Sequence, residues 1–188
     1  SAKVEFMSDI DTHSISGTGL AIARSVMNEG MSLFSAFAML LNYQRFGKMP
    51  AMCTVVEWSV RDESQHAEGM AKLFRAFCEE HPRIVNDDFK KDIYEMFRTA
   101  VKLEDKVIDL AYEMGDLEGL SAADVKQYIR YLADRRLLQL GLKTNWKVKE
   151  NPLPWMEELL GGSSISNFFE KRVTDYNAHG LEGDDWGW

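Results

Sequence analysis

Residues 61–66 read RDESQH, and this stretch decides how the rest of the chain is interpreted. Glu63 and His66 lie three positions apart within a helical pattern, so both side chains project from the same face of a helix. Helical bundles that hold two metal ions use such a Glu-x-x-His turn on each of two helices, plus one carboxylate on each of two others. This chain contains a single turn of this kind. The sequence therefore predicts half of a metal site.

The composition predicts one soluble domain of ordinary size. The chain has 188 residues, of which 45% are hydrophobic and 28% are charged, which is sufficient for a core. It contains no apolar stretch long enough to span a membrane and no signal-peptide pattern, so we expect a cytoplasmic protein. The net charge of −8 argues against nucleic-acid binding. Cys53 and Cys78 match neither a disulfide framework nor a zinc spacing.

Apolar residues recur at helical spacing along most of the chain, and no stretch alternates as a strand does. Gly47 closes the first helical run, and Pro50 is typical of the first turn of the second. Asn86 is a typical N-cap, and Ser121 with Asp124 resembles a capping box. The predicted helices cover residues 18–46, 50–80, 86–115 and 121–140, and a short helix follows residue 155 and ends near residue 160. The predicted fold class is all-α, a helical bundle.

Two carboxylates interrupt the apolar stripes. Glu29 lies three positions after Val26 on the first predicted helix, and Glu63 lies three after Val60 on the second. An unpaired charge in the core costs several kcal/mol, so each carboxylate needs a partner. Together with His66, across a tight turn, they favour a bound cation. Oxygen and imidazole ligands suit iron or manganese better than a structural zinc site.

Each of these residues also has an ordinary structural interpretation. In this interpretation, a glutamate in an apolar stripe forms an ion pair with Arg24 or Arg61, or its side chain extends to the surface. His13, His81 and His179 are typical of loop or helix-end histidines without a catalytic role. The metal interpretation therefore depends on the two carboxylates and the histidine occurring together.

A longer series of motifs resembles the second half of the small, radical-generating subunit of class I ribonucleotide reductase. The resemblance covers residues 17–180 and is far more specific than one Glu-x-x-His turn. The motifs are EG and SAF within residues 29–37, GKM at 47–49, RDESQH at 61–66, GLS at 119–121, QYIRYLADRRL at 127–137, NPLPW at 151–155 and NFFE at 167–170.

This resemblance implies a ferritin-like fold with a dinuclear iron or manganese-iron centre, which reacts with oxygen to make a stable oxidant, usually a tyrosyl radical. The oxidant passes to a large subunit that reduces ribonucleotides to deoxyribonucleotides. Asp62 corresponds to a residue of the radical-transfer route, and Phe37, with Leu33, to the apolar wall near the oxygen-reactive site. The residues that correspond to metal ligands are Glu29, Glu63 and His66.

The sequence departs from the family pattern at its beginning. The first carboxylate ligand, the first Glu-x-x-His turn, the radical tyrosine and the tryptophan of the transfer route are missing. Asp9, Asp11 and His13 lie in a polar opening without a helical stripe and do not replace them. We therefore expect the C-terminal half of a split small subunit. A second chain would then supply the N-terminal half, complete the bundle and share the metal centre, within a higher-order dimer.

Two alternatives are open. In the first, two copies of the chain pair symmetrically and together provide six ligands, as in a ferritin-like di-iron oxidase or a metal-storage protein. In the second, the half-site is vestigial and the chain is a non-enzymatic interaction protein. Metal titration separates them, because the split enzyme needs its complement, the symmetric form binds alone and the vestigial form does not bind.

The C-terminal residues lose helical periodicity after Gly161, which divides the chain into a helical half-bundle over residues 1–162 and a predicted flexible tail over 163–188. The tail is acidic and ends in Trp186 and Trp188. Disordered segments with aromatic ends commonly dock into a partner's groove, so we expect these tryptophans to bind the large subunit. A solvated terminus is the alternative. By resemblance, Tyr176 is the candidate for a redox-active tyrosine that relays the oxidant.

Overall fold

The computed structural model describes residues 2–8 and 12–159, and this part of the chain is helical with no strand. The all-α fold class is therefore confirmed. The elements are α1 (Ala2–Ser8), α2 (Ile15–Met27), the π-helix η1 (Asn28–Ser32), α3 (Phe34–Arg45), α4 (Pro50–Glu80), the 3₁₀-helix η2 (Pro82–Ile84), α5 (Asp87–Ala111), α6 (Ala122–Gln139) and α7 (Pro154–Leu159).

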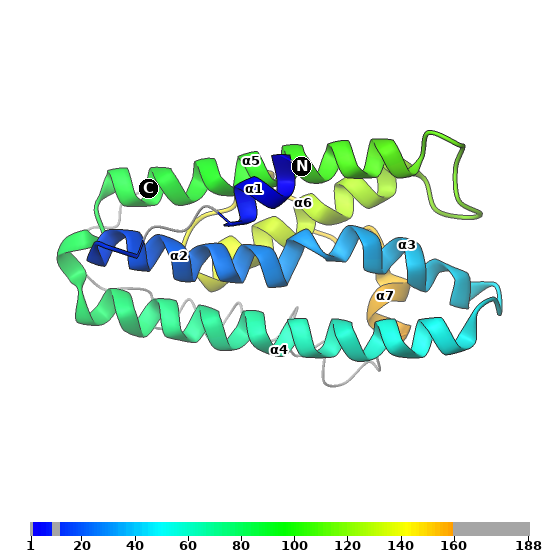
Figure 1. Ribbon diagram of the computed structural model, residues 1–188, viewed down its shortest axis with the longest axis horizontal. Coiled ribbons are helices and arrows are strands. Elements are labelled where there is room, and N and C mark those ends of the chain that lie inside the picture. Colours follow the sequence, from blue (N-terminus) through cyan, green and yellow to red (C-terminus); the bar gives the residue numbers. More distant parts are fainter. Residues whose placement is uncertain (1, 9–11, 160–188) are drawn as a thin grey trace.

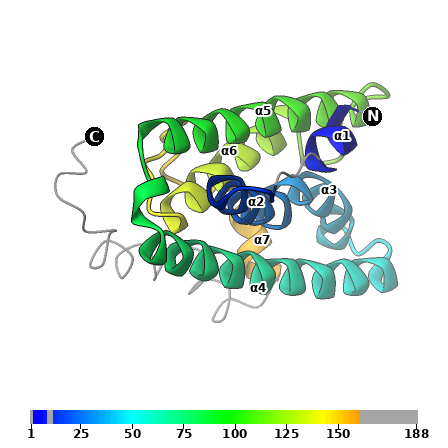
Figure 2. The same cartoon turned by 60° about the vertical axis from the view of Figure 1, so that its left-hand side comes forward.

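The long helices form an antiparallel bundle. The elements α2, η1 and α3 follow one another along a single line through the middle of the molecule, with α5 on one side and α4 on the other (Figure 1). The helix α6 lies behind this line, and α2 packs against both α4 and α5. In the turned view, α2 is seen nearly end-on between α5 and α4 (Figure 2). The central line therefore contacts every other long helix.

Local chemistry explains where the helices begin. The Asn86 side chain accepts a 3.0 Å hydrogen bond from the backbone N–H of Phe89, which caps α5. Ser121 and Asp124 form a reciprocal capping box at the start of α6. Pro50 occupies the first turn of α4, where its missing N–H leaves no helical hydrogen bond unmade. These starts agree with the sequence predictions.

The core lies where the apolar stripes of the long helices meet. Its side chains recur every three or four residues along each helix, as expected for helices that bury one face. Members without solvent exposure include Ala23, Val26, Met27, Met31, Phe34, Leu41, Val60, Ile93, Phe97, Ile129 and Leu132.

The structure differs from the sequence predictions in several places, of which three bear on the site and its surroundings. The first predicted helix is interrupted by η1, which side-chain periodicity does not reveal because a π turn changes the hydrogen-bond register. A short helix, α1, occupies the polar opening, where Arg24 lies over the Phe6 ring at 4.7 Å and donates to the Phe6 carbonyl. The helix α5 ends at Ala111 rather than near residue 115, and turns follow it.

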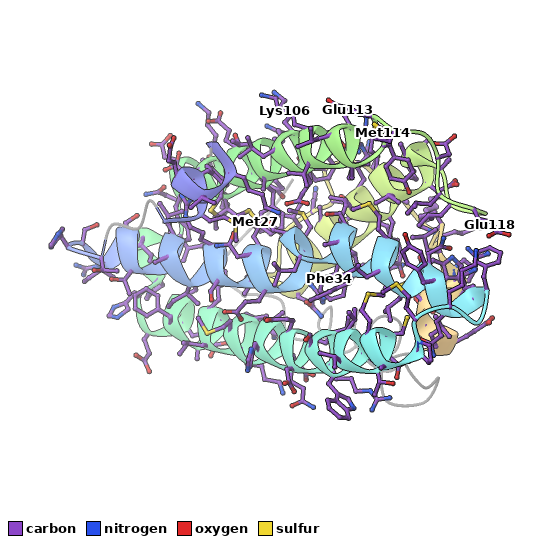
Figure 3. All side chains as sticks on the ribbon, turned by 45° about the vertical axis from the view of Figure 1, so that its right-hand side comes forward. Met27, Phe34, Lys106, Glu113, Met114 and Glu118 are labelled. Atoms are coloured by element: carbon purple, nitrogen blue, oxygen red, sulfur yellow. The ribbon has the colours of Figure 1, made fainter. Side chains whose placement is uncertain are left out.

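The surface of the described residues carries a few exposed apolar side chains. Met114 lies beyond the end of α5, near Glu113 (Figure 3). On α4, the side chains of Val55, Trp58 and Leu73 are about half exposed or more, on a face that no other described helix covers. Among the helices of the described part, none combines the length and apolar character needed to cross a bilayer.

Candidate metal centre

Glu29 lies in the first turn of the π-helix η1, at the middle of the central helical line. Its Oε1 atom accepts a 3.0 Å hydrogen bond from Oγ of Ser25, one turn earlier on α2. Its Oε2 atom is buried and has no hydrogen-bond partner among the described residues. A buried carboxylate oxygen without a partner is costly, so its position favours a cation nearby.

Glu63 and His66 extend from α4 toward Glu29. Because three residues span almost one helical turn, the Glu63 Oε2 and His66 Nδ1 atoms come within 3.6 Å of each other. One ligand atom from each of Glu29, Glu63 and His66 lies within 4.8 Å of the other two. These three residues therefore surround one common point between η1 and α4.

The donor set fits the metals implied by the sequence. Two carboxylates and one imidazole are typical ligands of iron and manganese, and the described residues provide no thiolate at this point. The unpartnered Oε2 atom of Glu29 would gain a partner from a bound cation. The residues present therefore fit a metal ion, although three ligands do not complete a dinuclear site.

The site is more open than the sequence pattern suggested. Glu29 is half-buried, the Glu63 side chain is 25% exposed and the His66 side chain is 62% exposed. The expectation of two core carboxylates was therefore wrong. The buried face of α4 runs through Val60 and Ser64, and each helical residue turns by about 100°, so Glu63 lies at the edge of this face.

The other predicted site residues lie either on the elements around this cluster or outside the described residues. Asp62 is exposed on α4, next to the ligand turn, and Leu33 is half-buried between η1 and α3. Phe37 is half-buried and packs edge-to-face on Phe34, with ring centroids 5.6 Å apart. Their roles stay predictions. The remaining predicted residues, Tyr176, Trp186 and Trp188, and the excluded Asp9 and Asp11, lie outside the described residues.

Two residues that the sequence reasoning missed contact the ligand-bearing segment. Ser25 lies four positions before Glu29, a spacing that places both on one helix face and was available as a signal. Arg136, on α6, donates from Nε to the carbonyl oxygen of Gly30 at 2.9 Å. No local pattern connects residues that are 106 positions apart.

Comparison with known proteins decides the family. Residues 1–152 match the model of the family described as ribonucleotide reductase, small chain. This chain belongs to that family. The small chain of ribonucleotide reductase generates a radical at a di-metal centre, and the cluster formed by Glu29, Glu63 and His66 agrees with that chemistry.

Individual relatives support the same family and the fold. A probable ribonucleoside-diphosphate reductase small subunit of Invertebrate iridescent virus 3 is 42% identical over 165 residues, covering 87% of this chain and 44% of the relative. The beta subunit of ribonucleoside-diphosphate reductase from Chlamydia pneumoniae is 33% identical, covering 82% of this chain and 44% of the relative. The chain thus spans less than half the length of these two relatives.

A solved structure confirms the ferritin-like architecture. The crystal structure of a Bacillus halodurans protein assigned to class I ribonucleotide reductase has a TM-score of 0.78 and 26% identity to this chain. The similarity covers 84% of this chain and 58% of that one. The bundle of the described residues is therefore part of a ferritin-like fold.

Proposed function

We propose that this chain supplies the C-terminal part of a ribonucleotide reductase small subunit, and with it one half of the di-metal centre. Glu29, Glu63 and His66 are the ligands that it contributes. The observation that carries the proposal is the convergence of three ligand atoms within 4.8 Å, beside a buried Glu29 oxygen that lacks a partner. The large subunit would use the resulting oxidant to make deoxyribonucleotides.

The chain's own residues prepare this half-site before metal arrives. Ser25 holds Oε1 of Glu29 by a hydrogen bond, which leaves Oε2 without a partner and available to a cation. When bound, the di-metal centre supplies the oxygen-dependent oxidising chemistry. Phe37 and Leu33 would provide apolar surface that keeps water from the oxidant, and Asp62 would be part of the transfer route. Metal loading requires the His66 imidazole to be neutral, because a protonated ring has no free lone pair.

The open side of the site favours completion by residues outside the described part. His66 is largely exposed, and the same outer surface of α4 carries the exposed apolar side chains of Val55 and Trp58. Exposed apolar surface beside unfinished coordination is typical of a face that packs on further helices. We propose that these helices carry the missing Glu-x-x-His turn and the missing carboxylate, whether on another polypeptide or elsewhere on a longer one.

The partner implied by this function is the large subunit. Trp186 and Trp188 would anchor the C-terminal segment in that subunit, and Tyr176 would relay the oxidant to it. The proposal for these residues rests on the sequence and on family membership. The assembly would work in the cytoplasm, where its nucleotide substrates are made.

Anaerobic Fe(II) titration, followed by metal analysis, tests the proposal. The 188-residue chain alone should bind Fe(II) weakly and show no stable radical. Adding a polypeptide with the N-terminal small-chain helices should create a site for two iron ions. Tight binding of two ions by a homodimer of this chain would instead establish the symmetric oxidase. Absence of binding even with the complement would establish a vestigial site.

A further inference from the structure

Arg136 is a buried cation that reaches the ligand-bearing segment from another helix. Its side chain has no solvent exposure, and its Nη1 atom donates to Oε1 of Gln139 at 3.0 Å. Its Nε atom donates to the carbonyl oxygen of Gly30, the residue directly after Glu29. Burial lowers the pKa of Arg136 to about 10, so the guanidinium is still charged at neutral pH. Such a burial is costly unless it is well hydrogen-bonded.

The hydrogen bond acts on an irregular part of the backbone. Gly30 lies inside η1, where the i to i+5 pattern widens the helix and displaces carbonyl groups from the regular α-helical ladder. Met27 and Phe34, which flank η1 along the chain, are labelled in Figure 3. The Arg136 guanidinium lies 6.0 Å from the centroid of the Phe34 ring. Arg136 therefore contacts η1 by a hydrogen bond and the first residue of α3 by an aromatic interaction.

Gly30 is matched to Arg136 by shape. A Cβ atom at residue 30 would lie 2.3 Å from Nε and 2.8 Å from Cδ of Arg136, which is closer than side chains can pack. The same Cβ would lie 3.2 Å from the Cβ atom of Ala67. Ala67 directly follows His66 on α4. The elements that carry all three ligands, η1 and α4, thus meet at the point that Arg136 occupies.

A second cation holds the last residue of η1. The Lys3 Nζ atom donates to the carbonyl oxygen of Ser32 at 2.7 Å and pairs with Glu104 on α5. Two carbonyl groups of a five-residue π-helix are therefore held by cationic side chains from two different elements. This arrangement restrains the backbone that directly follows Glu29.

We infer that Arg136 is a positioning residue: by holding the Gly30 carbonyl against α6, it fixes the π turn that directs Glu29 at Glu63 and His66. The inference rests on the proposed function, because it assigns the ligand role to Glu29. Residues that orient metal ligands typically change metal affinity by about 10- to 100-fold when they are mutated. The effect is transmitted through the backbone, since Arg136 donates to the residue after Glu29 and not to its carboxylate.

The first test compares two arginines on the same helix. In the metal-free chain, Arg136→Lys keeps the charge but loses the Nε donor, so amide hydrogen exchange over residues 28–32 should become about tenfold faster. Arg130→Lys is the matched control, because Arg130 lies on the same helix as Arg136 but pairs at 2.6 Å with Asp105 of α5. It should leave exchange over residues 28–32 unchanged. Unchanged exchange in Arg136→Lys would overturn the inference.

The second test leaves Arg136 in place, so that it does not depend on folding of the first variant. Gly30→Ala should displace the guanidinium and accelerate exchange over residues 28–32, whereas Gly69→Ala, where a new Cβ meets nothing within 4 Å, should not. In the chain reconstituted with its complementary helices, Arg136→Lys and Gly30→Ala should each weaken Fe(II) binding about 10- to 100-fold. Wild-type affinity in both variants would refute the positioning role.

The two proposals fail in different ways. If the wild-type chain with its complement binds no iron, the proposed function is wrong. Arg136 then positions no metal ligand, so the inference fails with it. If the wild type binds iron and neither variant alters exchange or affinity, the proposed function stands and the positioning role is wrong. Urea unfolding of each variant separates a local effect on η1 from a loss of global stability.

Discussion

Oγ of Ser35 on α3 donates a 2.7 Å hydrogen bond to Oε2 of Glu104 on α5. The Glu104 residue is buried, with only 1% of its surface exposed. Lys3 lies 2.5 Å from the other carboxylate oxygen. Burial nevertheless raises the pKa of Glu104, because loss of hydration outweighs the opposing effects of Lys3 and Ser35. The folded state therefore holds this proton more tightly than the unfolded state does.

This relationship predicts a pH dependence of stability. Because the folded-state pKa of Glu104 is above its ordinary value of 4.5, the folded state binds more protons, and the free energy of unfolding should fall as pH rises from about 4.5 through the raised pKa. Glutamine does not titrate, so Glu104→Gln should remove the contribution of Glu104 to the dependence of the free energy of unfolding on pH. Urea unfolding at a series of pH values measures it. Identical slopes in the variant and the wild type would contradict the prediction.

Asp134 should be important for stability rather than for metal binding. Its buried carboxylate accepts backbone hydrogen bonds from Asn145, Trp146 and Val148 at 2.7, 3.0 and 2.9 Å, which ties the segment after α6 to the bundle. Asp134→Ala leaves three N–H groups without this partner and should lower the free energy of unfolding by about 3 kcal/mol or more. The exposed Asp92→Ala should change it by no more than about 0.5 kcal/mol. Equal stability of the two variants would refute this role.

Removing either candidate ligand from α4 should prevent metal loading and leave the bundle intact. Glu63→Ala and His66→Ala each remove one of the three convergent ligand atoms, yet both side chains lie at the edge of the core. In the complex with the complementary helices, metal analysis should show loss of iron while circular dichroism is unchanged. The exposed neighbour Gln65→Ala is the control and should load normally. Full iron occupancy in both ligand variants would remove the ligand assignment.

The cysteines should be unreactive in the folded chain. Both side chains are buried, and burial raises the pKa of Cys53 and raises the pKa of Cys78 to about 12. A thiol that stays protonated is a poor nucleophile, so modification by iodoacetamide at pH 8 should be at least about tenfold slower than in denaturant. Mass spectrometry over time measures both rates. Rapid labelling under native conditions would show that one of these helices opens locally.

Two variants of the C-terminal segment should separate radical relay from docking to the large subunit. Tyr176→Phe keeps the ring but removes the phenolic proton, so it should abolish nucleotide reduction and leave binding to the large subunit unchanged. Deleting residues 186–188 should weaken binding instead, since a buried tryptophan at a hot spot contributes about 2 kcal/mol or more. Each variant is the control for the other in a paired assay of binding and turnover. Normal turnover by Tyr176→Phe would disprove the relay.

Short-range chemistry made much of this protein predictable from its sequence. The caps at Asn86 and Ser121 act within three or four residues, so the helix starts that they mark agree with the structure. The Glu63 and His66 pair also depends only on helical geometry, which brings positions three apart onto one face. The motif series identified the family because it preserves order and spacing over most of the chain.

Tertiary structure decided what depends on residues far apart in the chain. The π turn that carries Glu29 is a change of hydrogen-bond register, and side-chain periodicity does not report it. The contact between Arg136 and the Gly30 carbonyl joins residues 106 positions apart, for which a single sequence has no local signal. The exposure of His66 depends on which helices cover α4. The sequence by itself therefore determined most of the helices and the types of the candidate ligands, whereas packing between helices decided where these side chains meet and how open their site is.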